Sequence, residues 1–270
     1  MPVSKKPVTS KPFTSVGLMG FGAFGRLMAR HLQPHLRLAV FDPAQEIPAS
    51  AEGKGLARAD LAGIGACDIV ILAMPVAEMP AAIAALRPHL KAGAIVLDVG
   101  SVKIGPALAM QADLPAHVEI IGTHPLFGPQ SGRHGIRGLK IALCPIRGSS
   151  AWRIGAFLRK ALGLTVIMTT PEAHDREAAM VQGLTHLIAK ILVGMEPLPR
   201  RMTTASFDLL MQATEMVRYD APGVFLAIER ANPHAKAVRD QFFALAEEMR
   251  VLLENGHKPN VSPRHPEQAA

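Results

Sequence analysis

Along the first 170 residues, short apolar runs alternate with segments of helical spacing. Some runs are apolar without interruption, as at 68–74, which is typical of strands buried on both faces of a sheet. We predict strands at 15–19, 36–42, 68–74, 94–100, 118–122, around 141 and around 166. Helices are predicted at 23–31, 79–86 and about 152–161. Strands alternating with helices predict an α/β fold with a doubly wound parallel sheet over residues 14–170.

From residue 171 the strand-like runs stop and the pattern becomes helical. Apolar positions recur at helical spacing in three sets: Ala178, Val181, Thr185, Ile188 and Leu192; Phe207, Leu210, Met211 and Thr214; Phe242, Leu245, Met249 and Leu252. We therefore expect a smaller all-helical domain at 171–256 that completes its core against a second copy, making the protein a homodimer. Residues 1–13 read as a disordered lead, and 257–270 as a tail.

Composition narrows the possible partners. The chain has 270 residues, a formal net charge of +7 and only 4% aromatic residues. Because the basic residues are scattered, nucleic acid is not expected, and an anionic small molecule suits the charge better. The two cysteines read as buried free thiols, with no metal site. No run is long enough to span a membrane, and no secretory signal is recognisable, so a cytoplasmic protein is expected.

The segment GFGAFG lies between the first predicted strand and the first helix. In this position a GxGxxG pattern is typical of the Rossmann-like pyrophosphate loop, where its glycines allow a tight turn, close approach and helix packing. Asp42 ends the second strand, where a carboxylate can accept hydrogen bonds from the ribose of NAD. The alternative is a glycine turn that binds no cofactor. The predicted cofactor contacts are Gly20, Gly22, Ala23, Phe24, Gly25, Asp42 and Ser101.

Two further motifs follow strands. GTHPLFGPQSG places His124 where a strand is expected to end and a loop to open, at the ligand crevice of an open sheet. Histidine suits proton transfer near neutral pH. DVGSVK places Ser101 after the neighbouring strand, facing the same crevice. The alternatives are a loop histidine without chemistry and a serine that caps a helix.

A last motif, PEAHDREAAMVQGLTHLIAK, opens the helical part. Gln182 and His186 are four residues apart and share a helix face. His174 and Asp175 fall in the first turn, where we interpret them as mainly structural. A lone helical histidine is otherwise usually solvated or capped.

In this order, GFGAFG, DVGSVK, GTHPLFGPQSG and HDREAAMVQGLTH resemble the prephenate/arogenate dehydrogenase family of tyrosine biosynthesis, over about residues 16–235. The form of the first and third motifs resembles the plant-type arogenate branch more than the enteric bifunctional one. The resemblance implies oxidative decarboxylation of arogenate to tyrosine, or of prephenate to 4-hydroxyphenylpyruvate, with NAD. It makes His124 the base for the C4 hydroxyl and Ser101 its orienting partner. His186 and Gln182 would then bind a substrate carboxylate or shape the pocket.

Substrate choice depends on Asp220, in RYDAPGVF. The plant-type arogenate enzymes carry an acidic residue in this segment, which favours arogenate because a carboxylate pairs with its ammonium group. The alternative is an aspartate that caps the following helix. Asp42 is a departure from the plant-type pattern, because the plant-type enzymes usually favour NADP, whereas an aspartate at this position favours NAD. The cation for the side-chain carboxylate is left open among Arg133, Lys103, Arg200, Arg201 and Arg218.

Two other functions fit parts of this pattern. One is a different NAD-dependent β-hydroxyacid or imine oxidoreductase, which would release no CO2. This function does not explain the segment HPLFGP. The other is a non-catalytic NAD-binding sensor, which would leave Ser101 and His124 without a role. Turnover of prephenate and arogenate with NAD and NADP separates all three.

Overall fold

A computed structural model describes residues 13–45, 47 and 55–255. The predicted lead, apart from Phe13, and the predicted tail lie outside the described residues.

The described strands form one sheet of eight in the order β3-β2-β1-β4-β5-β6-β7-β8. All neighbouring pairs are parallel except β6 and β7. The fold is therefore the predicted doubly wound, Rossmann-like α/β sheet, and its last two strands, β7 and β8, run opposite to the other six. The strands are β1 Ser15–Met19, β2 Arg37–Phe41, β3 Leu56–Arg58, β4 Ile69–Leu72, β5 Ile95–Asp98, β6 Glu119–Pro125, β7 Lys140–Arg147 and β8 Thr165–Met168.

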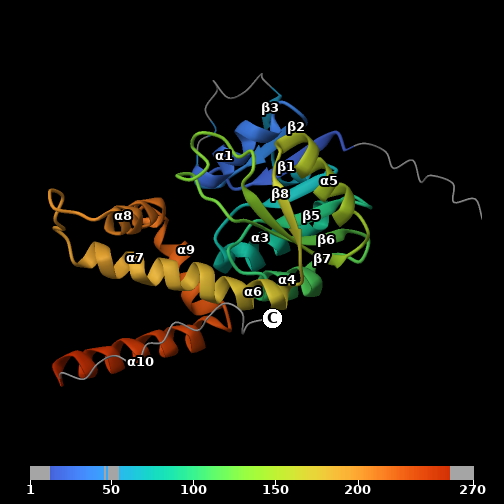
Figure 1. The fold of residues 1–270 in the computed structure, drawn as a ribbon. Coiled ribbons are helices and arrows are strands. Elements are labelled where there is room, and N and C mark those ends of the chain that lie inside the picture. The colour runs from blue at the N-terminus through green and yellow to red at the C-terminus, as the bar shows by residue number, and fades with distance from the viewer. Residues whose placement is uncertain (1–12, 46, 48–54, 256–270) are drawn as a thin grey trace, which may run out of the picture.

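Helices cover both faces of this sheet (Figure 1). Residues of α1 (Ala23–Leu32) and α5 (Ala151–Leu162) share one apolar cluster with alternate side chains of the strands. Residues of α2 (Leu61–Gly65), α3 (Met79–Leu86) and α4 (Ile104–Asp113) share a second apolar cluster with the strand side chains that point to the opposite face of the sheet. Single turns of 3₁₀ helix, η2 (Val76–Glu78) and η3 (Arg87–His89), flank α3. Burial on both faces explains the uninterrupted apolar runs of the central strands.

Two features differ from the sequence-based expectation. Strand β6 was expected to end at Gly122 but runs to Pro125, because β7 pairs with it in antiparallel register, His124 opposite Ala142 and Pro125 opposite Ile141. Three short or weakly patterned elements, β3, α2 and α4, were not predicted. In α4, Gly105 and Pro106 occupy the first turn, where proline is tolerated but gives a loop-like sequence.

The described residues after Pro171 form only helices. α6 (Pro171–Ala178), the π-helical turn η4 (Ala179–Gly183) and α7 (Leu184–Gly194) form one continuous rod that starts beside α4 and projects from the sheet (Figure 1). α8 (Ala205–Val217), α9 (Pro222–Leu226), the π-helical turn η5 (Ala227–Ala231) and α10 (Ala235–Glu254) follow. The helices of the described part include none that is both long and apolar enough to cross a bilayer.

Candidate active site

The glycine loop has the shape that a dinucleotide requires. Gly20 has φ +103°, and a Cβ there would lie 2.2 Å from the carbonyl oxygen of Ala73. A Cβ on Gly25 would lie 2.2 Å from the Gly20 oxygen, whereas one on Gly22 would meet nothing within 4 Å. The first and third glycines are therefore required by the fold, and the second borders open space where a pyrophosphate can approach. Gly22 is also the N-cap of α1, without a side-chain cap, which leaves backbone N–H groups for an anion.

Asp42 lies at the end of β2 beside this loop. Its Oδ2 accepts a hydrogen bond from the Phe21 backbone N–H at 2.6 Å, and its Oδ1 accepts from Ala44 and Gln45 at 2.8 and 3.0 Å. The carboxylate is thus held in a fixed orientation next to the glycine turn. Arg26 donates to the side chain of Gln45 at 3.1 Å. A cation therefore also stands near this end of β2, although no arginine directly follows Asp42 in the sequence.

His124 is buried at the end of β6. Burial lowers its pKa well below the usual 6.5, and His174, Lys103 and His186 add to the effect. The imidazole is therefore neutral at neutral pH, as a proton acceptor must be. Its Nε2 has no hydrogen-bond partner among the described residues, and the atom keeps some accessible surface although the residue is 3% exposed.

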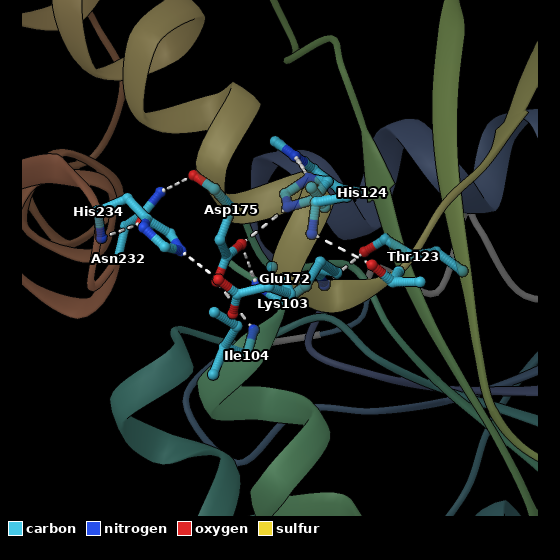
Figure 2. Close-up of polar contacts among 12 residues, drawn as sticks. Lys103, Ile104, Thr123, His124, Glu172, Asp175, Asn232 and His234 are labelled. Atoms are coloured by element: carbon cyan, nitrogen blue, oxygen red, sulfur yellow. Dashed lines mark hydrogen bonds and ion pairs between the residues drawn. The ribbon is translucent and has the colours of Figure 1, made fainter. Parts of the chain in front are cut away.

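The partner of His124 is His174, not the predicted Ser101. His124 Nδ1 lies 2.8 Å from His174 Nε2, and His174 Nδ1 lies 2.8 Å from Asp175 Oδ1. Asp175 is fully buried and also accepts from the backbone N–H groups of Lys103 at 2.7 Å and Ile104 at 2.9 Å. Figure 2 shows Asp175 between this start of α4 and His124. The interpretation of His174 and Asp175 as mainly structural was therefore incomplete.

Ser101 lies where the sequence predicted, at the same sheet edge as His124. Strands β5 and β6 are parallel neighbours with Asp98 opposite Gly122, so the segments that follow leave the sheet side by side. Ser101 is partly buried, and no hydrogen bond joins it to another described residue. It remains a candidate for contact with a ligand in the crevice.

A buried ion pair lies behind His124. Lys103, 1% exposed, donates from Nζ to Asp98 Oδ2 and, at 2.6 Å, to the Thr123 carbonyl. Burial raises the pKa of Asp98, and the Lys103 ammonium opposes this shift. Because its ammonium group is buried and donates to two protein acceptors, Lys103 is excluded from the candidate cations for a substrate carboxylate.

His186 and Asp220 form a second pair. His186 Nε2 lies 3.1 Å from Asp220 Oδ2, and His186 Nδ1 lies 2.9 Å from the Gln182 carbonyl oxygen. Both ring nitrogens of His186 are thus engaged within the protein, whereas the sequence predicted a substrate carboxylate as its partner. Asp220 does not cap α9: the N-cap is Ala221, without a side-chain bond. Its Oδ1 faces Gly128 of the histidine-proline motif, 3.7 Å from where a Cβ would stand.

Gln182 lies in the π-helical turn η4 and has a buried side-chain oxygen, Oε1, without a partner. π-helical turns often occur at functional sites, and a buried unsatisfied oxygen needs a donor. Gln182 therefore fits a polar contact to a ligand better than it fits the core.

A cleft lies between the segment after His124 and the helical part. Its walls include Arg133, Arg200 and Arg218, while Arg201 is not among its lining residues. Arg218 is paired with Glu196 and Glu215. Arg133 and Arg200 have no carboxylate within ion-pair distance among the described residues, so they are the better candidates for binding a carboxylate. A separate recess lined by Arg26, Arg30 and Arg133 lies along α1.

These features define the class of protein: an α/β protein with a Rossmann-like dinucleotide loop and a buried histidine at the adjacent sheet edge. Residues 28–150 match the family described as "Prephenate dehydrogenase, nucleotide-binding domain". These comparisons support the prephenate/arogenate dehydrogenase family for this chain.

One relative is a probable arogenate/prephenate dehydrogenase of Methanocaldococcus jannaschii, which is 27% identical over 70% of this chain and 44% of that protein. Another is the chloroplastic arogenate dehydrogenase 2 of Arabidopsis thaliana, which is 27% identical over 82% of this chain and 64% of that protein. The chain thus spans less than two thirds of either. A crystal structure of A. aeolicus prephenate dehydrogenase with hydroxyphenyl propionate and NAD+ has the same fold, with a TM-score of 0.69, 20% identity and 92% and 93% coverage of the two chains.

Proposed function

We propose that this protein catalyses the NAD-dependent oxidative decarboxylation of arogenate, and of prephenate less efficiently, in tyrosine biosynthesis. The observation that carries the proposal is a buried, neutral His124, whose Nε2 has no partner among the described residues, at the sheet edge beside the glycine loop. In this proposal residues 14–170 bind the dinucleotide and residues 171–256 complete the substrate pocket. Two of the relatives bear arogenate dehydrogenase in their names, which supports the same activity.

The reaction needs a proton acceptor and accurate placement more than a strong acid or a metal, because forming the aromatic ring drives the loss of CO2. NAD, when bound, accepts the hydride from C4 of the substrate ring. His124 Nε2 takes the proton of the C4 hydroxyl as the C4 carbonyl forms. The C1–carboxylate bond then breaks, CO2 leaves, and the bonding electrons make the ring an aromatic phenolate, which recovers the proton from His124 to give the phenol. Ser101 holds the hydroxyl near His124, which lowers the entropic cost of reaching the reactive geometry.

Asp220 supports arogenate as the preferred substrate. Arogenate has an ammonium group where prephenate has a keto oxygen. The carboxylate of Asp220 is 21% exposed, faces the histidine-proline motif and uses one oxygen for His186, which leaves Oδ1 for an ammonium group. A charged pair in a site closed from water discriminates strongly between these two ligands. Arg133 or Arg200, which line the cleft beside Tyr219, would bind the side-chain carboxylate.

Asp42 supports NAD over NADP. Its carboxylate accepts from the loop N–H groups with part of its capacity and stays partly exposed at the ribose end of the site. A 2′-phosphate would meet this negative charge at close range. Arg26 opposes the preference, but its guanidinium is already hydrogen-bonded to Gln45.

The helical part supports a homodimer. α10 extends away from the sheet (Figure 1), and its most extensive contacts within the chain are with η4 and η5. Large apolar side chains on α8 and α10 are left exposed in the single chain: Leu209, Leu210, Met216, Phe243, Leu245, Met249, Val251 and Leu253. Such a surface suits burial against a second copy.

A single experiment tests the function. Initial rates are measured with prephenate and arogenate, each with NAD and NADP, following reduced cofactor and CO2 together. The proposal requires equal amounts of both products, with arogenate and NAD giving the highest kcat/KM. Reduced cofactor without CO2 would instead indicate a β-hydroxyacid or imine oxidoreductase. Binding of NAD without turnover of any substrate would indicate a sensor.

A further inference from the structure

Three side chains from two distant parts of the chain form one hydrogen-bonded line. It runs from His124 on β6 through His174 to Asp175 on α6, with 2.8 Å at each step. All three are buried, and Asp175 is fully enclosed. The rings of His124 and His174 meet edge to face, with centroids 5.0 Å apart and planes at 67°.

The direction of the hydrogen bonds can be deduced from the fixed end of this line. The oxygens of Asp175 accept from two backbone N–H groups at the start of α4, so the ionised carboxylate is stabilised there without needing a cation. A carboxylate only accepts, and therefore the third donor, His174 Nδ1, carries a proton. In neutral His174, Nε2 is then an acceptor. The proton between the two histidines must lie on Nδ1 of His124.

We propose that His174 and Asp175 are positioning residues that fix His124 in the tautomer protonated at Nδ1, which leaves Nε2 as the base. This proposal rests on the proposed function for the identity of the reaction, but the tautomer itself does not depend on it. When His124 Nε2 takes the substrate proton, the new imidazolium is already hydrogen-bonded to a chain that ends in a carboxylate. The chain therefore both orients the base and stabilises its charged form.

The competing arrangement is a protonated His174, which would donate from Nε2 to His124 Nδ1 and place the His124 proton on Nε2. His124 could not then act as a base. The surroundings disfavour this second cation, because the ring of His174 is buried and two backbone N–H groups already stabilise the Asp175 carboxylate. Other titratable groups around the line are Asp98 on β5, Cys144 on β7 and His186 on α7. On the far side of α6, His234 pairs with Glu172, as Figure 2 shows.

Neighbouring contacts hold the line in place from the helical part. The side chain of Asn232 donates to the backbone oxygen of Asp175 at 2.7 Å, and its own Oδ1 accepts from the N–H of His234 (Figure 2). The turn after η5 therefore braces the first turn of α6. The rigidity of Asp175 is what makes the tautomer of the two histidines determinate.

The direct test is ¹⁵N NMR of histidine-labelled wild-type protein without ligands, near neutral pH, with His124→Asn and His174→Gln spectra for assignment. We expect a pyrrole-type Nδ1 and a pyridine-type Nε2 for His124. In His174→Phe, which removes the acceptor but fills the space, we expect the Nδ1 signal to lose its pyrrole character. A pyridine-type Nδ1 in the wild-type protein would overturn the proposal.

Kinetics provide the second test. His174→Phe should lower kcat roughly 10- to 100-fold, the usual cost of losing a group that orients a functional histidine, while KM and the Kd of NAD change little. His174→Gln keeps an oxygen near the position of Nε2 and should restore part of kcat. His117→Gln, which alters an exposed histidine bonded to the Leu90 carbonyl, is the control. Wild-type kcat in both His174 variants would refute the positioning role.

The two tests separate this proposal from the proposed function. If the wild-type protein turns over neither prephenate nor arogenate, the proposed function fails, and the NMR spectrum still decides the tautomer. Melting temperatures and NAD titrations of each variant show whether a loss of kcat comes from unfolding. If His174→Phe does not fold, the wild-type spectrum and His174→Gln decide the question.

Discussion

His186 is held between two groups that can only accept hydrogen bonds, the carboxylate of Asp220 at 3.1 Å and the carbonyl of Gln182 at 2.9 Å. Both ring nitrogens of His186 therefore face acceptors of the protein itself. The pair joins α7 to the turn before α9, and the remaining oxygen of Asp220 faces Gly128. The contact with His186 therefore orients the carboxylate that we propose selects the substrate.

Replacing Asp220 with Asn should reverse the substrate preference. The variant keeps an oxygen for His186 but loses the charge that an ammonium group needs, so kcat/KM for arogenate should fall by about 10- to 100-fold. Activity with prephenate should rise. Asp113→Asn, at the exposed end of α4, removes one charge far from the site and serves as control. An unchanged ratio of the two kcat/KM values would remove Asp220 from substrate selection.

Replacing Asp42 with Ser should relax the cofactor preference. The change removes the charge that repels a 2′-phosphate and also the bond to the Phe21 N–H, so NAD should bind more weakly and NADP more tightly. The measurement is kcat/KM for both cofactors at saturating substrate. A wild-type enzyme that uses NADP at least as well as NAD would show that this role of Asp42 is wrong.

Replacing His124 with Asn should reduce kcat by roughly 10²–10⁴-fold, the usual range for a lost general base. The Kd of NAD, measured by fluorescence titration, should be almost unchanged, because the glycine loop is built on β1 and α1. Near wild-type turnover would exclude His124 as the base.

The pKa of His124 also predicts how stability depends on pH. Because the folded protein holds this pKa well below 6.5, the unfolded chain binds the proton first as the pH falls. The stabilising contribution is therefore present above pH 6.5 and is lost as the pH falls from 6.5 toward the folded pKa. Urea unfolding between about pH 7 and about pH 5 should show a shallower decline for His124→Asn than for the wild-type protein. Parallel curves would contradict the shift.

Assembly can be measured directly. Sedimentation at micromolar concentration should give a dimer, with a total interface above about 2,000 Å² in its crystal structure, as obligate dimers show. Leu245→Glu and Phe243→Glu on α10 should weaken it. Because both positions are exposed in the single chain, the substitutions should not disrupt the core of the sheet domain. A monomeric wild-type protein would exclude the homodimer.

The parts of the site that could be predicted from the sequence are those set by local geometry. The turn at Gly20 and the position of Asp42 follow from the strand–turn–helix pattern alone, and the structure has both. The contact between His124 and His174 joins residues 50 positions apart and depends on where α6 begins against α4, which no local pattern encodes. The only available sign was that a histidine and an aspartate are adjacent in the first turn of the helix.

The extension of β6 through Pro125 has the same cause. A proline and two glycines in one short segment normally indicate a loop, and only the antiparallel partner β7 keeps the backbone extended there. Similarly, the Asp220–His186 pair depends on the return of the chain after α8, which the helical pattern alone does not specify.

Asp175 gives α4 the cap that its own N-terminal residue lacks, since Lys103 makes no side-chain capping bond. The same carboxylate orients His174, so a fragment that ends near residue 170 would keep the strand bearing His124 while losing both the cap and the orienting partner. The first part of the chain could then still hold a nucleotide yet be chemically idle. A chimaera can be made from the nucleotide-binding part of one relative and the helical part of another. It should therefore stay active only when α4, His124 and the start of α6 come from the same parent.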